Sequence, residues 1–207
     1  MISAREALAR LREGNERFVS GRGSLAGFSS ARILELTKGQ EPFAVILGCS
    51  DSRVPAEIVF DQGLGDLFVI RVAGNIVAPS QVGSVEYAAA ALGTKLVVVL
   101  GHTQCGAVVA TVDLMLEPRP ARSRNLRSIV DRIRPSVAGL LNTELSRDRD
   151  ALVRQAVRAN VGVSVSHLRH GSELLEELIE RDGVRVVGAE YSLETGAVEF
   201  FDDDLGG

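Results

Sequence analysis

Three chemically unlike side chains alternate along one short segment of the sequence. Cys49, Asp51 and Arg53 directly follow an apolar run over residues 43–47, and they offer a thiolate, a carboxylate and a fixed cation. If the segment is extended, alternate side chains point to the same side, so all three would face one site. A carboxylate and a guanidinium beside a thiol are not side chains that pack a hydrophobic core, and we therefore expect the segment to be functional.

A second set of reactive side chains follows a later apolar run. His102 and Cys105 come just after the largely apolar segment 95–100, with two residues between them. Thiolates and imidazoles are good zinc ligands, and a His-x-x-Cys pair can chelate a metal from one turn. Together with Cys49 they make a set of two cysteines and one histidine, which is one ligand short of a tetrahedron.

The residues leave two arrangements open for the fourth ligand position. In one, Asp51 binds the metal and closes the site. In the other, Asp51 pairs with Arg53 and a water takes the fourth position, as in catalytic zinc sites. Zinc lowers the pKa of a bound water to roughly 7, which would generate a nucleophile for a small electrophile near neutral pH.

The segments that must position these residues alternate between strand and helix. Largely apolar segments at residues 43–48, 67–72, 95–100 and 184–189 predict buried strands, and residues 197–201 predict a short last strand. Helical spacing predicts helices between them. The alternation favours an α/β fold: a mostly parallel central sheet of four strands with a short additional antiparallel strand, and helices on both faces.

This order of elements also predicts where a site would form. Ligands of open α/β sheets bind beyond the carboxyl ends of the strands. Cys49 ends the first predicted strand, while His102 and Cys105 follow the third. We therefore expect the three candidate ligands to converge in one crevice.

The N-terminal residues are expected to form a helical arm. Ser3 and Glu6 have the spacing of a capping box, and a narrow apolar stripe follows at helical spacing. We expect residues 1–40 to lie across another surface and residues 43–201 to form the α/β core, with residues 1–207 making a single domain.

The region between the third and fourth predicted strands is expected to be largely helical. Two or three helices are predicted over residues 125–181. Breaks are expected near Pro135 and Asn142, because proline and asparagine commonly interrupt a helical pattern.

Composition limits the partners and the compartment. The chain has 207 residues and a net charge of −4, which argues against nucleic acid as its main partner. It shows neither an export signal nor an apolar run of bilayer length, so we expect a cytoplasmic protein without a membrane partner. Cys49 and Cys105 are the only cysteines. A disulfide between them is the alternative to reduced thiols, and it is less favoured in that compartment.

The two motifs together resemble those of the β-class carbonic anhydrases. The matching segments are Cys49-Ser50-Asp51-Ser52-Arg53, Gly101-His102-x-x-Cys105-Gly106, Glu13-Gly14-Asn15-x-Arg17-Phe18, Gly65-Asp66-x-Phe68-x-x-Arg71-x-Ala73-Gly74-Asn75 and Ser84-x-Glu86-Tyr87. The similarity extends from about residue 5 to residue 200. Because the chain has no tryptophan, it is more similar to the plant-like branch of the family than to the other branch.

The resemblance implies a zinc enzyme that hydrates carbon dioxide reversibly to bicarbonate and a proton, by attack of zinc-bound hydroxide. It implies one Zn²⁺ per chain, with Cys49, His102 and Cys105 as ligands. Asp51 would be either a fourth ligand or a catalytic dyad with Arg53. The alternatives are hydrolysis of carbon disulfide or carbonyl sulfide at the same site, or a zinc-binding protein without catalysis.

The resemblance further implies a substrate site and an assembly. The substrate-binding residues would be Gln40, Phe68, Ala73, Tyr87 and Gly106, of which the second, third and fourth would line an apolar carbon dioxide pocket. The assembly would be a homo-oligomer, either a dimer or a dimer of dimers. In it the N-terminal helix would embrace the partner chain, and the active site would lie at the interface.

Overall fold

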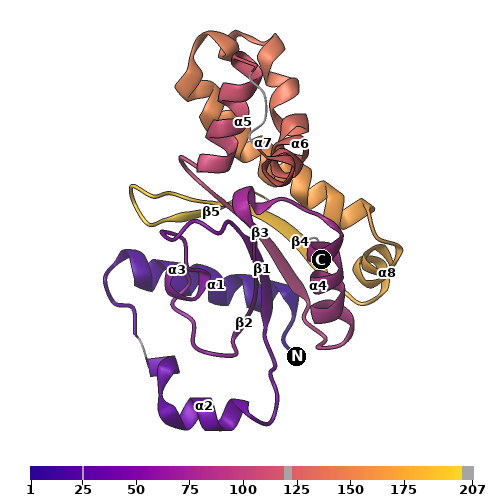
Figure 1. Ribbon diagram of the computed structural model, residues 1–207. Helices are drawn as coiled ribbons and strands as arrows, with labels where there is room; N and C mark the ends of the chain where they lie inside the picture. Colours follow the sequence, from indigo (N-terminus) through magenta and orange to yellow (C-terminus); the bar gives the residue numbers. More distant parts are fainter. Residues whose placement is uncertain (25, 119–122, 202–207) are drawn as a thin grey trace.

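A five-stranded sheet runs through the centre of the structure, a computed structural model that describes residues 1–24, 26–118 and 123–201 (Figure 1). Its strands are β1 (Ala44–Gly48), β2 (Leu67–Arg71), β3 (Leu96–His102), β4 (Arg185–Tyr191) and β5 (Val198–Phe200). They lie in the order β2-β1-β3-β4-β5; β1 to β4 are parallel, and β5 is antiparallel to β4. The predicted α/β fold is therefore confirmed, including its short antiparallel strand.

Helices cover both faces of this sheet and extend beyond it. The α-helices are α1 (Ala4–Val19), α2 (Ser30–Leu36), α3 (Ala56–Val59), α4 (Pro79–Ala90), α5 (Gly106–Leu116), α6 (Arg124–Ala138), α7 (Arg149–His170) and α8 (Glu173–Arg181). Short 3₁₀ helices are η1 (Ala26–Phe28), η2 (Ala73–Asn75), η3 (Leu140–Asn142) and η4 (Glu144–Arg147). Among the helices of the described residues, none combines the length and apolar character that a bilayer-spanning segment needs.

The sheet is buried on both faces because successive strand side chains point to opposite sides. Ala44 and Ile46 of β1 pack into one cluster with α1 and α3. Val45 and Leu47 pack into another cluster with α4, α8 and the C-terminal half of α7. A continuous apolar run satisfies both faces, which explains why unbroken hydrophobic runs identified the strands.

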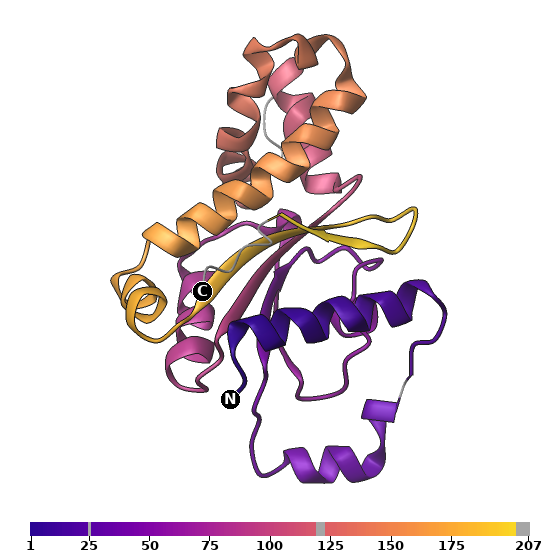
Figure 2. The same ribbon diagram turned by 180° about the vertical axis from the view of Figure 1, so that it is seen from behind.

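A third cluster lies beyond the carboxyl ends of the parallel strands. It joins α5, α6 and the N-terminal half of α7 to the two cysteines. Figures 1 and 2 show these helices gathered at one end of the sheet, with α2 at the opposite end. The candidate site therefore lies between the strand ends and this helical layer.

The predicted break near Pro135 is wrong, because α6 continues for three residues after the proline. Ile133, Ser136 and Val137 are buried in this last turn. Their packing holds the helix although the proline removes one backbone hydrogen bond. The interruption expected near Asn142 is present, since η3 ends there and separates α6 from α7.

Helix α1 begins as predicted, at a capping box formed by Ser3 and Glu6. The resemblance implied that this helix embraces a partner chain, but in the structure its apolar residues cover the chain's own sheet. Its apolar residues Ala7, Leu8 and Leu11 are buried in the same cluster as one face of the chain's own sheet. Helix α2 instead has no buried residue, and the side chains Ile33 and Leu34 are exposed.

Candidate metal centre

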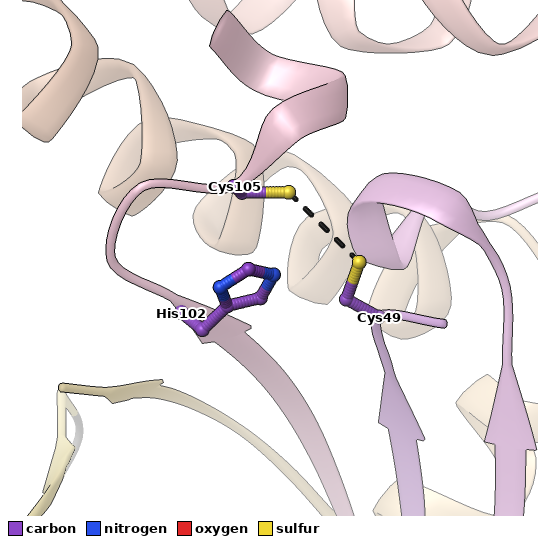
Figure 3. A group of neighbouring side chains, drawn as sticks. All are labelled: Cys49, His102 and Cys105. Atoms are coloured by element: carbon purple, nitrogen blue, oxygen red, sulfur yellow. Dashed lines mark hydrogen bonds between the residues drawn. The ribbon is translucent and has the colours of Figure 1, made fainter. Parts of the chain in front are cut away.

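Three ligand atoms meet where β1 and β3 end. Cys49 follows β1, His102 is the last residue of β3, and Cys105 is the N-cap of α5. Because β1 and β3 are parallel neighbours, their carboxyl ends lie side by side. The three potential ligand atoms lie within 4.8 Å of one another and belong to buried residues. Figure 3 shows the imidazole and the two sulfurs gathered at one point.

The imidazole of His102 is arranged as a metal ligand would be. Its Nδ1 lies 2.9 Å from the carbonyl oxygen of Thr103 and donates to it, which leaves the Nε2 lone pair free. His102 is fully buried, and Nε2 has no hydrogen-bond partner among the described residues. A buried polar atom without a partner is costly, so this atom fits a metal ion.

The two thiols complete a donor set typical of zinc. Their sulfurs are 3.9 Å apart, which is too far for a disulfide, and both cysteines are free. A hydrogen bond from the Cys105 thiol lowers the pKa of Cys49 to about 4, against the opposing effect of burial. The same bond, together with burial, raises the pKa of Cys105. A bound cation would favour the thiolate form of both cysteines, because thiolates are the forms that bind metal ions.

Asp51 is paired with Arg53 in this structure. The guanidinium donates from Nε to Oδ1 at 2.9 Å and from Nη2 to Oδ2 at 2.8 Å. These hydrogen bonds hold the pKa of Asp51 well below its usual range. Oδ2 nevertheless lies only 3.8 Å from Nε2 of His102. The structure therefore has the arginine pair of the second arrangement, with the carboxylate beside the ligand cluster.

Arg71 at the end of β2 holds the segment that carries these residues. It is paired with Gly48 across the sheet. Its Nε donates to the carbonyl oxygen of Cys49 at 3.1 Å, and its Nη2 donates to that of Asp51 at 2.6 Å. The sequence showed this arginine only as part of a matching motif, because a side chain that binds backbone carbonyls leaves no local pattern.

The five expected substrate-binding residues lie in different places. Gly106 begins α5 directly after Cys105, and Ala73 precedes Gly74, whose amide touches Cys49. The other three, Gln40, Phe68 and Tyr87, lie farther along their elements from the residues of the cluster.

Phe68 and Tyr87 contact each other, with ring centroids 6.2 Å apart. Phe68 lies near the start of β2, and the Tyr87 side chain on α4 is half exposed. Gln40 is exposed and precedes β1, whereas Cys49 follows it. A strand of five residues spans roughly 16 Å. One chain therefore does not bring Gln40 to its own cluster.

The fold and the site together define an α/β protein with a buried cysteine–histidine cluster, able to hold a metal ion, at the ends of parallel strands. The sequence model of the family "Carbonic anhydrase" matches residues 44–198. Carbonic anhydrase 2 of Mycobacterium tuberculosis is 42% identical over 186 residues, which cover 90% of this chain and 87% of the relative.

Solved structures agree with this relationship. The β-carbonic anhydrase CafA of Aspergillus fumigatus matches with a TM-score of 0.75 and 26% identity, over 95% of this chain and 89% of the other. The β-carbonic anhydrase CcaA matches with a TM-score of 0.74 and 29% identity, over 97% and 90%. The chain belongs to the β-class carbonic anhydrases, a family of enzymes, which confirms the resemblance seen in the sequence motifs.

Proposed function

We propose that the protein catalyses the reversible hydration of carbon dioxide to bicarbonate and a proton, with one Zn²⁺ per chain held by Cys49, His102 and Cys105. The observation that carries the proposal is the convergence of these three ligand atoms within 4.8 Å. The partnerless Nε2 of His102 supports it further. When bound, zinc acidifies a water and so makes a nucleophile available near neutral pH.

The acidic residue beside the cluster would orient the attacking water. Arg53 keeps Asp51 ionised through two side-chain hydrogen bonds, so its carboxylate accepts hydrogen bonds and does not donate them. Because Oδ2 lies 3.8 Å from Nε2 of His102, a water at the cluster is within its reach. By accepting a hydrogen bond from that water, the Asp51 carboxylate would direct a lone pair of the water's oxygen toward the substrate carbon.

The substrate would lie beside the cluster, near Ala73 and Gly106, with Phe68 and Tyr87 contributing apolar surface. Gln40 is at the other end of β1, so a second copy of the chain would be needed to bring this amide to a cluster. We therefore propose a homo-oligomer, either a dimer or a dimer of dimers. We also propose that the chain is a single domain, that it is cytoplasmic and that it belongs to the plant-like branch of the family.

The proposal is tested by metal analysis combined with stopped-flow hydration of carbon dioxide. We expect about one zinc per wild-type chain and rapid hydration. His102→Ala should lose both, because it removes a ligand, whereas His170→Ala on the exposed end of α7 should lose neither. Zinc-loaded protein without hydration activity at alkaline pH would refute the proposal. Competition by carbon disulfide and carbonyl sulfide would show which electrophile the site prefers.

A further inference from the structure

A left-handed turn lies directly behind the Cys49 sulfur. Gly74 has φ 72° and ψ 23°, and the next residue, Asn75, has φ 42°. Two consecutive residues in this region are unusual, and a non-glycine residue there needs support from its surroundings. The amide of Gly74 donates to the Cys49 sulfur at 3.3 Å. The turn thus aims one backbone N–H at a candidate metal ligand.

Two polar side chains of α7 hold the carbonyl groups of this turn. Asn160 donates from Nδ2 to the Gly74 oxygen at 2.8 Å, and the Ser164 hydroxyl donates to the Asn75 oxygen at 3.0 Å. They are four residues apart and therefore lie on one face of the helix. Both are buried, with 2% and 3% of their surface exposed.

The amide of Asn160 is also held at its other end. Its Oδ1 accepts a hydrogen bond from the Ser136 hydroxyl of α6 at 3.4 Å, so Nδ2 is the atom that faces the turn. The neighbouring buried positions of α7, Val157 and Val161, are apolar. Burying an amide in such a face is costly unless it is hydrogen-bonded, and the bonds that satisfy it run to the turn and to α6.

We propose that Asn160 and Ser164 are positioning residues for the metal ligand Cys49, because they fix the turn that directs the Gly74 amide at its sulfur. The proposal rests on the proposed function, in which Cys49 binds zinc. An N–H bond to a ligating sulfur fixes the sulfur's position and draws charge from it. Outer contacts of this kind typically change metal affinity about 10- to 100-fold when they are removed.

The decisive variant is Asn160→Leu, which keeps the side chain's shape and removes the donor. Zinc affinity is measured by competition with a chromophoric chelator. We expect the zinc dissociation constant to rise roughly 10- to 100-fold. In protein loaded with Co²⁺, the thiolate-to-cobalt charge-transfer band should shift, because the sulfur loses its hydrogen bond.

Val165→Ala is the matched control on the same helix. It creates a cavity against the sheet without touching the turn, so it should lower the free energy of unfolding and leave zinc affinity and the cobalt band unchanged. A zinc affinity of Asn160→Leu equal to that of wild type or of this control would overturn the proposal. A wild-type chain that binds no zinc would instead refute the proposed function.

Ser164→Ala carries the test if Asn160→Leu does not fold, because it deletes a single oxygen atom. We expect a severalfold weaker zinc affinity and faster hydrogen exchange of the Gly74 amide in the metal-free protein. Unchanged values for both measurements in this variant would overturn the proposal.

Discussion

At the scale of single residues, the charge of Asp51 is set by its neighbour Arg53. Both carboxylate oxygens accept hydrogen bonds from the guanidinium, and one of them, Oδ2, also faces His102. Without the guanidinium, the carboxyl would lose the side-chain hydrogen bonds that lower its pKa most, and its pKa would rise. The same change would free Oδ2 to approach the ligand cluster.

Arg53→Ala should therefore raise the pKa of Asp51 toward the ordinary aspartate value of about 3.9. Carboxyl NMR across an acid titration of the metal-free protein measures it directly. Arg147→Ala, which breaks the exposed pair with Glu144, is the control and should leave Asp51 unchanged. A wild-type Asp51 that already titrates near 4 would contradict the expectation.

The same substitution has a pH-dependent effect on stability. Since the pairing depresses the pKa of Asp51 in the folded state, its contribution is present above about pH 4 and is lost as the pH falls through the folded value. The difference in free energy of unfolding between wild type and Arg53→Ala should therefore become smaller as the pH is lowered below about 4. It should be small at every pH, because half of the arginine side chain is exposed and solvent screens the pair.

At the scale of elements, α7 reaches the turn at Gly74 and Asn75 because it crosses the sheet closely over two glycines. A Cβ on Gly101 of β3 would lie 2.5 Å from Cγ2 of Val161, and one on Gly188 of β4 would lie 2.8 Å from its Cγ1. Atoms do not approach so closely, so larger residues would push the helix outward. The glycines thereby set the position of Asn160 relative to Gly74.

Gly101→Ala should destabilise the metal-free protein by about 1–3 kcal/mol, because it overpacks this crossing. Urea unfolding in the presence of a chelator measures the packing effect alone. Adding Val161→Ala should restore part of the loss, since it removes the methyl groups in the way.

Gly162→Ala is the control on the exposed side of α7. It meets no atom within 4 Å and should stabilise by about 0.5–1 kcal/mol, because alanine favours a helix. Equal stability of Gly101→Ala and wild type would show that α7 can move away from the sheet freely.

At the scale of the whole molecule, the N-terminal arm leaves apolar surface uncovered. Ile33 and Leu34 of α2 are 56% and 71% exposed, whereas the apolar face of α1 is buried. Figure 1 shows α2 at the end of the molecule away from α5 and α6. The exposed pair and Gln40 belong to the same N-terminal arm, which makes this region the expected contact between copies.

Replacing Ile33 and Leu34 by aspartate should shift the protein toward smaller assemblies. Burying each aliphatic side chain contributes about 1.5–3 kcal/mol, and the variant replaces that gain with the cost of burying charge. Sedimentation equilibrium measures the shift. Leu174→Asp on α8 is the control at another exposed apolar position and should assemble as wild type does. A monomeric wild-type protein would contradict the proposed homo-oligomer.

Most of the fold and the ligand cluster were predictable from local pattern. The central strands β1 and β3 are buried on both faces, so largely apolar segments identified them. Cys49 follows β1, His102 ends β3 and Cys105 comes three residues later, so a parallel sheet was expected to place all three at one edge; the pairing of β1 with β3 then brings them together. The break at Pro135 was wrong because packing of the last turn of α6 outweighs a lost hydrogen bond.

By itself, the sequence determined the α/β architecture, the family and the residues able to bind a metal, because residue type and periodicity are local properties. The tertiary structure alone decided that α1 covers its own sheet and that Asp51 pairs with Arg53. It also decided that Asn160 holds Gly74, 86 residues away. The first and third of these contacts depend on how closely distant elements approach, which no pattern of neighbouring residues records. The pairing of Asp51 was one of two arrangements that the sequence left open, and the geometry of the folded chain chose between them.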